Sequence, residues 1–396
     1  MVPTRDAYGR SGHARPRVRL TRLAGVSTRS AVEAAWRLAE SSAVGALLAV
    51  APAGEAALLG AFQEPGRSGA REEVRGPCGG RSAFAGEGVV LWWALVAEPS
   101  EWGIEAGLSG PRCLNRLVRG ALAGLTQIGV RPSYPGRDFV AAAGRRVAQL
   151  SLGRGAGGGL LFQAVVAATR PFATAEPAPE YPGLPALPPA GALGIEPQAV
   201  CSALSAGFAE QFALELAPAE PSADELRALA ATPLPALDDP ELAGLRAGGF
   251  VATPIGRLAA HVALRDDGSL DRVRLRGDWI AAREPLRALE RSLAGRRADD
   301  PALRELCARW LAAPESGVVG LTDPGALVEA LERSARAARS RSSTQWRARI
   351  RHGPSARWPT SSVPLAVTLV TPPFSSSKRS SQNAFSSSSR GKPSGS

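Results

Sequence analysis

Short apolar runs, punctuated by glycine and proline, follow one another through the first half of the chain. The runs GALLAVAP and AALLGAF, within residues 45–62, predict two buried strands. The run VVLWWALVA, which starts at Val89 and is rich in β-branched and aromatic residues, predicts a central strand. Side chains alternate along a strand, so Trp92 and Trp93 must face opposite sides of the sheet.

Helical periodicity appears between these strands. Residues 31–41 (AVEAAWRLAES) predict a short amphipathic helix. From residue 114 to residue 128 the apolar positions recur every three or four residues, until Gly129 ends the helix. A further helix is predicted from Gln198 to about Leu214.

Two hairpins complete the pattern. The segment DFVAAAGRRVAQLSL turns at Gly144, and LLFQAVVAA adds a strand after it. Beyond residue 248, RLAAHVAL and LDRVRLRG flank an Asp-Asp-Gly-Ser turn, and helical segments follow. This mixture predicts an α/β, or layered α+β, fold: a mixed, largely antiparallel central sheet flanked by helices, with a smaller α+β accessory domain.

Composition sets the expected domain boundaries. Residues 1–29 carry seven Arg and a single acidic residue, and they predict a disordered basic extension. Residues 30–215 form the predicted main domain and residues 248–338 the accessory domain, with a linker at 216–247. Residues 339–396 are rich in Ser, Arg and Pro and predict a disordered tail.

The net charge of +11 belongs to this tail. From Ser334 onward there are nine Arg, two Lys and no acidic residue, so residues 1–333 balance at 36 basic and 36 acidic side chains. Such a tail attracts RNA, DNA or acidic membranes without reading a sequence. The folded part is therefore not expected to bind nucleic acid specifically.

Other classes of protein are excluded by composition. The chain has no run of about 18 apolar residues, which argues against a membrane span. Its four cysteines lack CxxC spacing, which argues against a zinc site or a disulfide framework and favours a cytoplasmic location. Three histidines are too few for a His-rich metal site.

The segment RGPCGGRSAF is the first candidate for chemistry. Gly79 and Gly80 permit close backbone approach, so their N–H groups can face a carboxylate or phosphate while Arg75 supplies charge. The competing interpretation is a plain turn between strands. Cys78 is the better candidate for a reactive thiol, because Cys201 lies on an apolar helical face and is expected to be a buried structural residue.

A second candidate is the arginine-rich hairpin GRDFVAAAGRRVAQLS. Arg137, Arg145 and Arg146 crowd around it, with Arg154 at its end. Guanidinium groups match carboxylates and phosphates in two-pronged hydrogen bonds, so the hairpin predicts anion binding. The alternative, a solvated arginine-rich face, stays equally open at this point.

Taken in order, five segments resemble one protein family. ALLGAFQEP, RGPCGGRSAFAGEG, NRLVRGALAGLTQIGV, GRDFVAAAGRRVAQLS and GGGLLFQAVV are similar to the successive motifs of the lipoate–protein ligase and octanoyltransferase (biotin/lipoate A/B protein ligase) family. The hairpin after residue 254 and its following helix resemble that family's C-terminal accessory domain. The resemblance covers about residues 30–315.

The resemblance implies a reaction and its participants. Family ligases use ATP with Mg²⁺ to activate lipoate or octanoate as an acyl-adenylate, and they pass the acyl group to a lysine of a lipoyl or acyl carrier domain. Arg146 takes the place of the family's hairpin lysine, which encloses the acyl carboxylate together with the Gly-rich loop. The implied substrate- and nucleotide-binding residues are Arg75, Cys78, Gly79, Gly80, Gly136, Arg137 and Asp138.

Several positions depart from the family pattern. Residues 1–377 contain no lysine, Arg81 replaces a third loop glycine, and Ala85 and Gly157 replace two histidines. Arg146 keeps a positive charge but is effectively never deprotonated, so it can hold an anion and cannot accept a proton. We predict a lipoate–protein ligase-like enzyme. Two alternatives stay open: a catalytically degenerate protein that binds an acyl group or carrier domain, and an octanoyltransferase that needs no ATP.

Overall fold

The computed structural model describes residues 15–40, 45–66, 68–154, 158–172, 180–220, 237 and 239–351, the last eleven of them by their backbone. Residues 1–347 belong to one compact unit. The boundaries that composition suggests for separate domains stay a prediction, and most of the predicted tail, from residue 352, lies outside the described residues.

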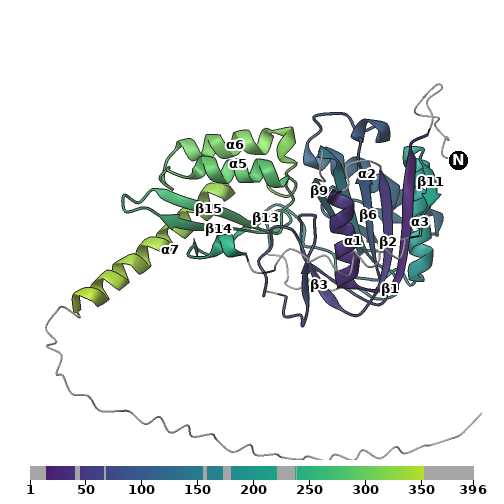
Figure 1. Ribbon diagram of the computed structural model, residues 1–396, viewed down its shortest axis with the longest axis horizontal. Helices are drawn as coiled ribbons and strands as arrows, with labels where there is room; N and C mark the ends of the chain where they lie inside the picture. The colour runs from purple at the N-terminus through teal and green to yellow at the C-terminus, as the bar shows by residue number, and fades with distance from the viewer. Residues whose placement is uncertain are drawn as a thin grey trace, which may run out of the picture. The chain divides into compact units, whose positions relative to one another are not determined.

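A mixed eight-stranded sheet forms the centre of the N-terminal region (Figure 1). Its order is β11-β1-β2-β6-β10-β9-β8-β7. The pairs β11–β1 and β1–β2 are parallel and the others antiparallel, which confirms the largely antiparallel sheet that the sequence predicts. The strands are β1 (Arg17–Ser27), β2 (Ala46–Ala53), β6 (Val89–Val96), β7 (Pro132–Ser133), β8 (Phe139–Ala142), β9 (Arg145–Arg154), β10 (Leu160–Ala167) and β11 (Glu215–Pro218).

Both faces of this sheet are covered. Helices α2 (Gly110–Gln127) and α3 (Pro197–Phe212) pack on the face that carries Trp92. The other face carries Trp93 and is covered by α1 (Thr28–Glu40) and by a small sheet of β3 (Ala56–Leu59), β4 (Glu73–Arg75) and β5 (Ala83–Ala85). The two adjacent tryptophans therefore do point in opposite directions, as strand geometry requires.

Strand β1 corrects the expectation of disorder over residues 17–27, while residues 1–14 of the predicted extension lie outside the described residues. Residues 17–27 pair with both β2 and β11, and the buried Val18 and Leu20 alternate with arginines that face outward. Alternation of apolar and charged residues is typical of a half-buried strand, and the high arginine content concealed it. The predicted linker is likewise shorter than expected, since β11 and β12 (Arg246–Ala247) occupy its two ends.

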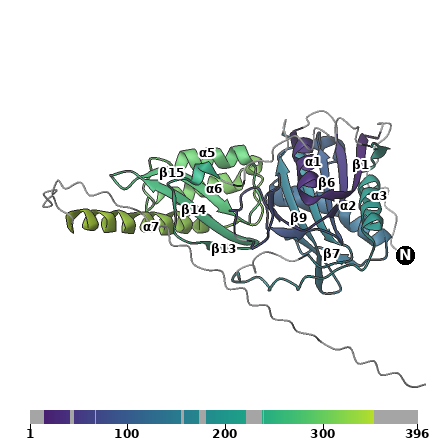
Figure 2. The ribbon, with the colours of Figure 1, turned by 60° about the horizontal axis from the view of Figure 1, so that its bottom comes forward.

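The C-terminal region has its own sheet (Figure 2). The predicted hairpin is confirmed as β14 (Gly256–Leu264) and β15 (Leu270–Gly277), while β12 and β13 (Val251–Thr253) pair with the opposite edge of β14. Helices α5 (Arg283–Leu293), α6 (Ala302–Ala312) and α7 (Pro324–Arg351) pack around this sheet. Helix α7 continues past residue 338, the predicted end of the accessory domain.

Candidate functional site

The Gly-rich loop between β4 and β5 lies directly against β9. The Gly79 N–H donates to the Leu152 carbonyl at 3.2 Å, and the Gly80 N–H donates to the Trp279 carbonyl of the C-terminal region at 3.1 Å. Both amides are thus already hydrogen-bonded within the chain. A backbone N–H has a single proton to donate, so neither amide is free to bind an acyl carboxylate or phosphate in this arrangement, and the binding role expected of them stays a prediction.

Close packing explains why this loop needs glycine. A Cβ atom at Gly79 would lie 2.9 Å from the Trp279 oxygen and from the Ile280 Cα. At Gly80, where φ is +124°, a Cβ atom would lie 2.8 Å from the Ser151 Oγ. The glycines do permit a close approach, as the sequence suggests. The atoms that approach them belong to the chain itself: backbone of residues 279 and 280 at Gly79, and the Ser151 side chain at Gly80.

Cys78 is a structural residue in this loop. Its side chain is buried, its Sγ lies 3.4 Å from the Leu161 carbonyl, and burial raises the pKa of the thiol far above its ordinary range. Cys201 on α3 is also buried, and burial raises its thiol pKa to about 11. Neither group forms the thiolate that nucleophilic chemistry requires at neutral pH.

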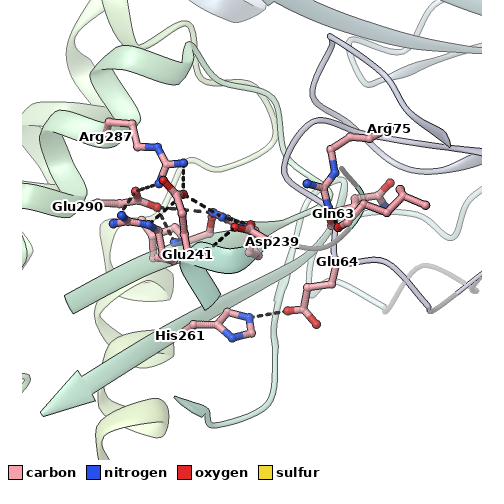
Figure 3. A network of polar contacts seen from close by, with 12 residues as sticks. Gln63, Glu64, Arg75, Asp239, Glu241, His261, Arg287 and Glu290 are labelled. Carbon is pink, nitrogen blue, oxygen red and sulfur yellow. Dashed lines mark hydrogen bonds and ion pairs between the residues drawn. The ribbon is translucent and has the colours of Figure 1, made fainter. Parts of the chain in front are cut away.

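Arg75 turns away from the predicted acyl site and towards the C-terminal region. Its Nη2 donates to the carbonyls of Gln63 at 3.1 Å and Leu237 at 3.2 Å (Figure 3). Burial lowers the pKa of Arg75, and the nearby Asp239 partly offsets this effect. Arg75 therefore lies beside the ion-pair network of the C-terminal region and helps to join the two parts of the unit.

Asp138 is engaged by a residue from the Gly-rich loop. Arg81 Nε and Nη2 donate to Asp138 Oδ2 and Oδ1 at 2.7 and 2.9 Å, and both side chains are buried. Gly136 forms the left-handed turn before them, with φ of +79°. The neighbouring Arg137 donates to the carbonyls of Pro185 and Pro254. Asp138 is thus shielded from solvent, whereas Gly136 is exposed and Arg137 is half-buried.

Arg146 differs from the other candidates because two nitrogens of its buried guanidinium lack a partner among the described residues, against one each in Arg75, Arg81 and Arg137. The residue is 5% exposed, and its guanidinium carbon lies 5.4 Å from the centre of the Phe172 ring. Its Nε and Nη1 have no hydrogen-bond partner among the described residues. Burial, followed by the positive charge of Arg81, lowers the pKa of Arg146 to about 10, so the group stays protonated at neutral pH.

Sequence reasoning missed a polar strip on the same face of the sheet. Gln149 and Ser151 on β9 and Gln163 on β10 are buried, and Ser151 pairs with Gln163 across the strands. Gln149 Nε2 donates to the Arg81 carbonyl, while its Oε1 has no partner among the described residues. The sequence did hold a sign of this strip, because Gln149 and Ser151 are two positions apart and therefore lie on the same face of an otherwise apolar strand.

The largest cavity that we describe lies elsewhere. It measures about 470 Å³ and is walled by Trp36 on α1, Pro77 in the Gly-rich loop, Arg154 at the end of β9 and Arg283 at the start of α5. Neither Arg146 nor Gly79 nor Gly80 lines it. This cavity is therefore not the predicted common cleft between the hairpin guanidinium and the loop amides, and that cleft stays a prediction.

The chain is similar to known proteins in its three-dimensional structure and not in its sequence. No family model and no curated protein matches the chain. Several solved structures do: a bi-partite lipoate protein ligase from Thermoplasma acidophilum is 12% identical, with a TM-score of 0.41 over 54% of this chain and 91% of that one. Lipoate-protein ligase A bound with ATP is 12% identical, with a TM-score of 0.40 over 55% and 93%. A biotin protein ligase from Aquifex aeolicus is 14% identical, with a TM-score of 0.27 over 50% and 69%.

The protein resembles lipoate–protein ligases in structure. Its activity has to be judged from its own residues. Within the described ranges, no three His, Cys, Asp or Glu side chains gather closely enough to hold a metal ion. Asp138, the carboxylate implied near the nucleotide, is saturated by Arg81, so these residues do not fit ATP with Mg²⁺ as they stand. No helix in the described part of the chain is long and apolar enough to cross a membrane.

Proposed function

We propose that the protein is a catalytically degenerate, lipoate–protein ligase-like protein that binds the carboxylate head of a medium-chain acyl group such as octanoate or lipoate. The observation that carries this proposal is the buried Arg146 guanidinium, with two nitrogens unpaired among the described residues. Buried charges in proteins are normally paired. A carboxylate supplies both the missing charge and two acceptor oxygens in the plane of a guanidinium.

The neighbours of Arg146 support an anionic ligand. Arg81 and Arg137 are within electrostatic reach of it, and Asp138 is the one carboxylate among the groups that act on its pKa. Phe172 lies beside the guanidinium and restricts its orientation. An acyl carboxylate would therefore be held by charge and by hydrogen bonds, with no proton transfer to Arg146.

Three observations support the loss of the ligase reaction. The amides of Gly79 and Gly80 donate within the chain, and Asp138 is held by Arg81. No lysine occurs before residue 378. The buried, high-pKa thiols of Cys78 and Cys201 give no support to an acyl-thioester route.

Calorimetric titration with octanoate and lipoate tests the binding. We expect Arg146→Met to weaken binding at least about tenfold, since a charge-assisted hydrogen bond contributes about 1.5–3 kcal/mol. Arg145→Met is the matched control, because Arg145 is the exposed neighbour on the same strand, and it should bind as the wild type does. Absence of binding to either acid, and to an acylated lipoyl domain, refutes the proposal.

The ligase and transferase readings are tested separately by intact mass. The chain is incubated with octanoate, ATP, Mg²⁺ and an unmodified lipoyl domain, and in parallel with an octanoyl-carrier donor in place of octanoate and ATP. We expect no acyl addition in either reaction. Addition in the first restores the ligase, and addition in the second alone identifies a transferase. Arg146→Lys then shows whether a lysine at this position is sufficient to return ligation.

A further inference from the structure

The ion pair between Arg81 and Asp138 is unusually complete. Arg81 Nε and Nη2 reach the two carboxylate oxygens at 2.7 and 2.9 Å, with the side chains 5% and 0% exposed. This fork geometry uses the in-plane lone pair of each oxygen. A divalent cation binds carboxylates through the same lone pairs, at closer range and with its own shell of oxygen ligands.

The charge around Asp138 also disfavours a metal ion. Three guanidinium groups, those of Arg81, Arg137 and Arg146, interact electrostatically with Asp138, and Asp278 interacts with Arg81, so three cations face two carboxylates and an excess of positive charge remains. A site with this excess attracts anions and repels cations. Asp278 already accepts hydrogen bonds from Gln63 Nε2 at 2.6 Å and from the Arg257 amide at 2.9 Å.

We propose that Arg81 is a built-in cation that takes the position of a divalent metal ion on Asp138 and so determines the specificity of the site. It makes the site selective for metal-free anions, such as an acyl carboxylate, over metal–nucleotide complexes. This inference rests on the proposed function and adds a reason for it. The poor fit of this site to ATP with Mg²⁺ then results from the Arg81 side chain alone. Removing that side chain should expose the Asp138 carboxylate as a metal ligand.

Manganese binding to the full-length chain, followed by electron paramagnetic resonance, tests the inference without any assay of activity. We expect no manganese binding by the wild type and at least about tenfold tighter binding by Arg81→Met, which has a side chain of similar length without charge. The double variant Arg81→Met with Asp138→Asn is the matched control. It should return to the wild-type result, because the carboxylate that Arg81→Met exposes is gone.

Three results would overturn the inference: manganese binding by the wild type as tight as that of Arg81→Met, no gain in a folded Arg81→Met, or an equal gain in the double variant. Circular dichroism establishes whether each variant folds. Should Arg81→Met fail to fold, the wild-type protein still gives a test. Manganese binding by the wild type contradicts the role of Arg81 as a built-in cation, and no manganese binding agrees with that role. Octanoate binding is measured without metal, so failure of the proposed function and failure of this inference are distinguishable.

Discussion

Two arginine clusters in this protein differ in how their cations are paired. In the C-terminal region Arg274, Arg276 and Arg287 form ion pairs with Asp239, Glu241 and Glu290, three against three (Figure 3). In the N-terminal region Asp138 interacts with Arg81, Arg137 and Arg146, and its printed ion pair is with Arg81. The N-terminal cluster is also the more buried, since Arg146 is 5% exposed while the side chains of Arg274 and Arg287 are 24% and 25% exposed.

The difference separates a structural role from a binding role. In the balanced cluster every charge has an opposite partner within the chain, and Glu290 also accepts a hydrogen bond from the Leu275 amide at 2.8 Å. In the N-terminal cluster two nitrogens of Arg146 have no hydrogen-bond acceptor among the described residues. An isolated buried charge is costly, so a protein tolerates an unpaired buried arginine when a bound ligand supplies the missing negative charge.

The largest expected effect comes from unbalancing the paired cluster. Glu290 is 1% exposed and lies within 4 Å of three arginines. Glu290→Ala leaves buried positive charge uncompensated and should lower the free energy of unfolding by about 3–5 kcal/mol. Urea-induced unfolding measures this change. Glu305→Ala is the control: its pair with Arg309 is exposed, so the expected loss is within about 1 kcal/mol, and equal losses would contradict the comparison.

A smaller difference in stability is expected between variants of two arginines, Arg276 and Arg146. Arg276→Met should destabilise the protein by about 3 kcal/mol, because Asp239 loses its buried partner. Arg146→Met removes a charge that has no ionic partner within the described part of the chain, and it should leave stability unchanged or raise it by about 1 kcal/mol. The same unfolding measurement compares the two variants. A loss of stability in Arg146→Met as large as that in Arg276→Met would show that Arg146 is structural after all.

The smallest effect is a pH dependence within the paired cluster. Burial raises the pKa of Asp239, but the hydrogen bond and charge of Arg276 outweigh it, and the net shift is downward. A lowered folded pKa contributes stability above the unfolded value of about 3.9, and this contribution is lost as the pH falls through the folded value. The stability difference between wild type and Asp239→Asn should therefore be constant near neutral pH and shrink on acidification below about pH 4.

The midpoints of urea-induced unfolding, measured across this pH range, show how far the stability difference between wild type and Asp239→Asn decreases. Asp266→Asn serves as the control, since Asp266 is exposed in the β14–β15 turn and its substitution should produce a small difference at every pH. A gap between wild type and Asp239→Asn that stays constant down to the lowest pH would contradict the assigned ion pair.

Much of the fold was predictable because local patterns were strong. The apolar run at residues 89–96, the helical period at residues 114–128 and the turn after Leu264 all appear as β6, α2 and the β14–β15 hairpin. The wrong prediction for residues 17–27 had a local cause as well, since the three arginines at positions 17, 19 and 22 masked an alternating strand. Pairing of that strand with β11, nearly two hundred residues away, was not accessible from any local pattern.

The sequence predicted the residue types of the candidate site better than their contacts. It singled out Arg146 and Arg81, and the structure buries both, while their roles in binding stay a prediction. It could not foresee that the Trp279 carbonyl would take the Gly80 amide, or that Arg75 would turn to the Gln63 and Leu237 carbonyls. Each of these contacts joins segments that are distant along the chain.

The sequence by itself determined the class of fold, the order of most elements, and the fact that no lysine is available to the folded part of the chain. Only the tertiary structure decided which buried arginines find carboxylates and which do not. The physical reason is that charge compensation depends on distances of a few ångströms between side chains, and those distances are set by the packing of loops and strands that no single segment encodes.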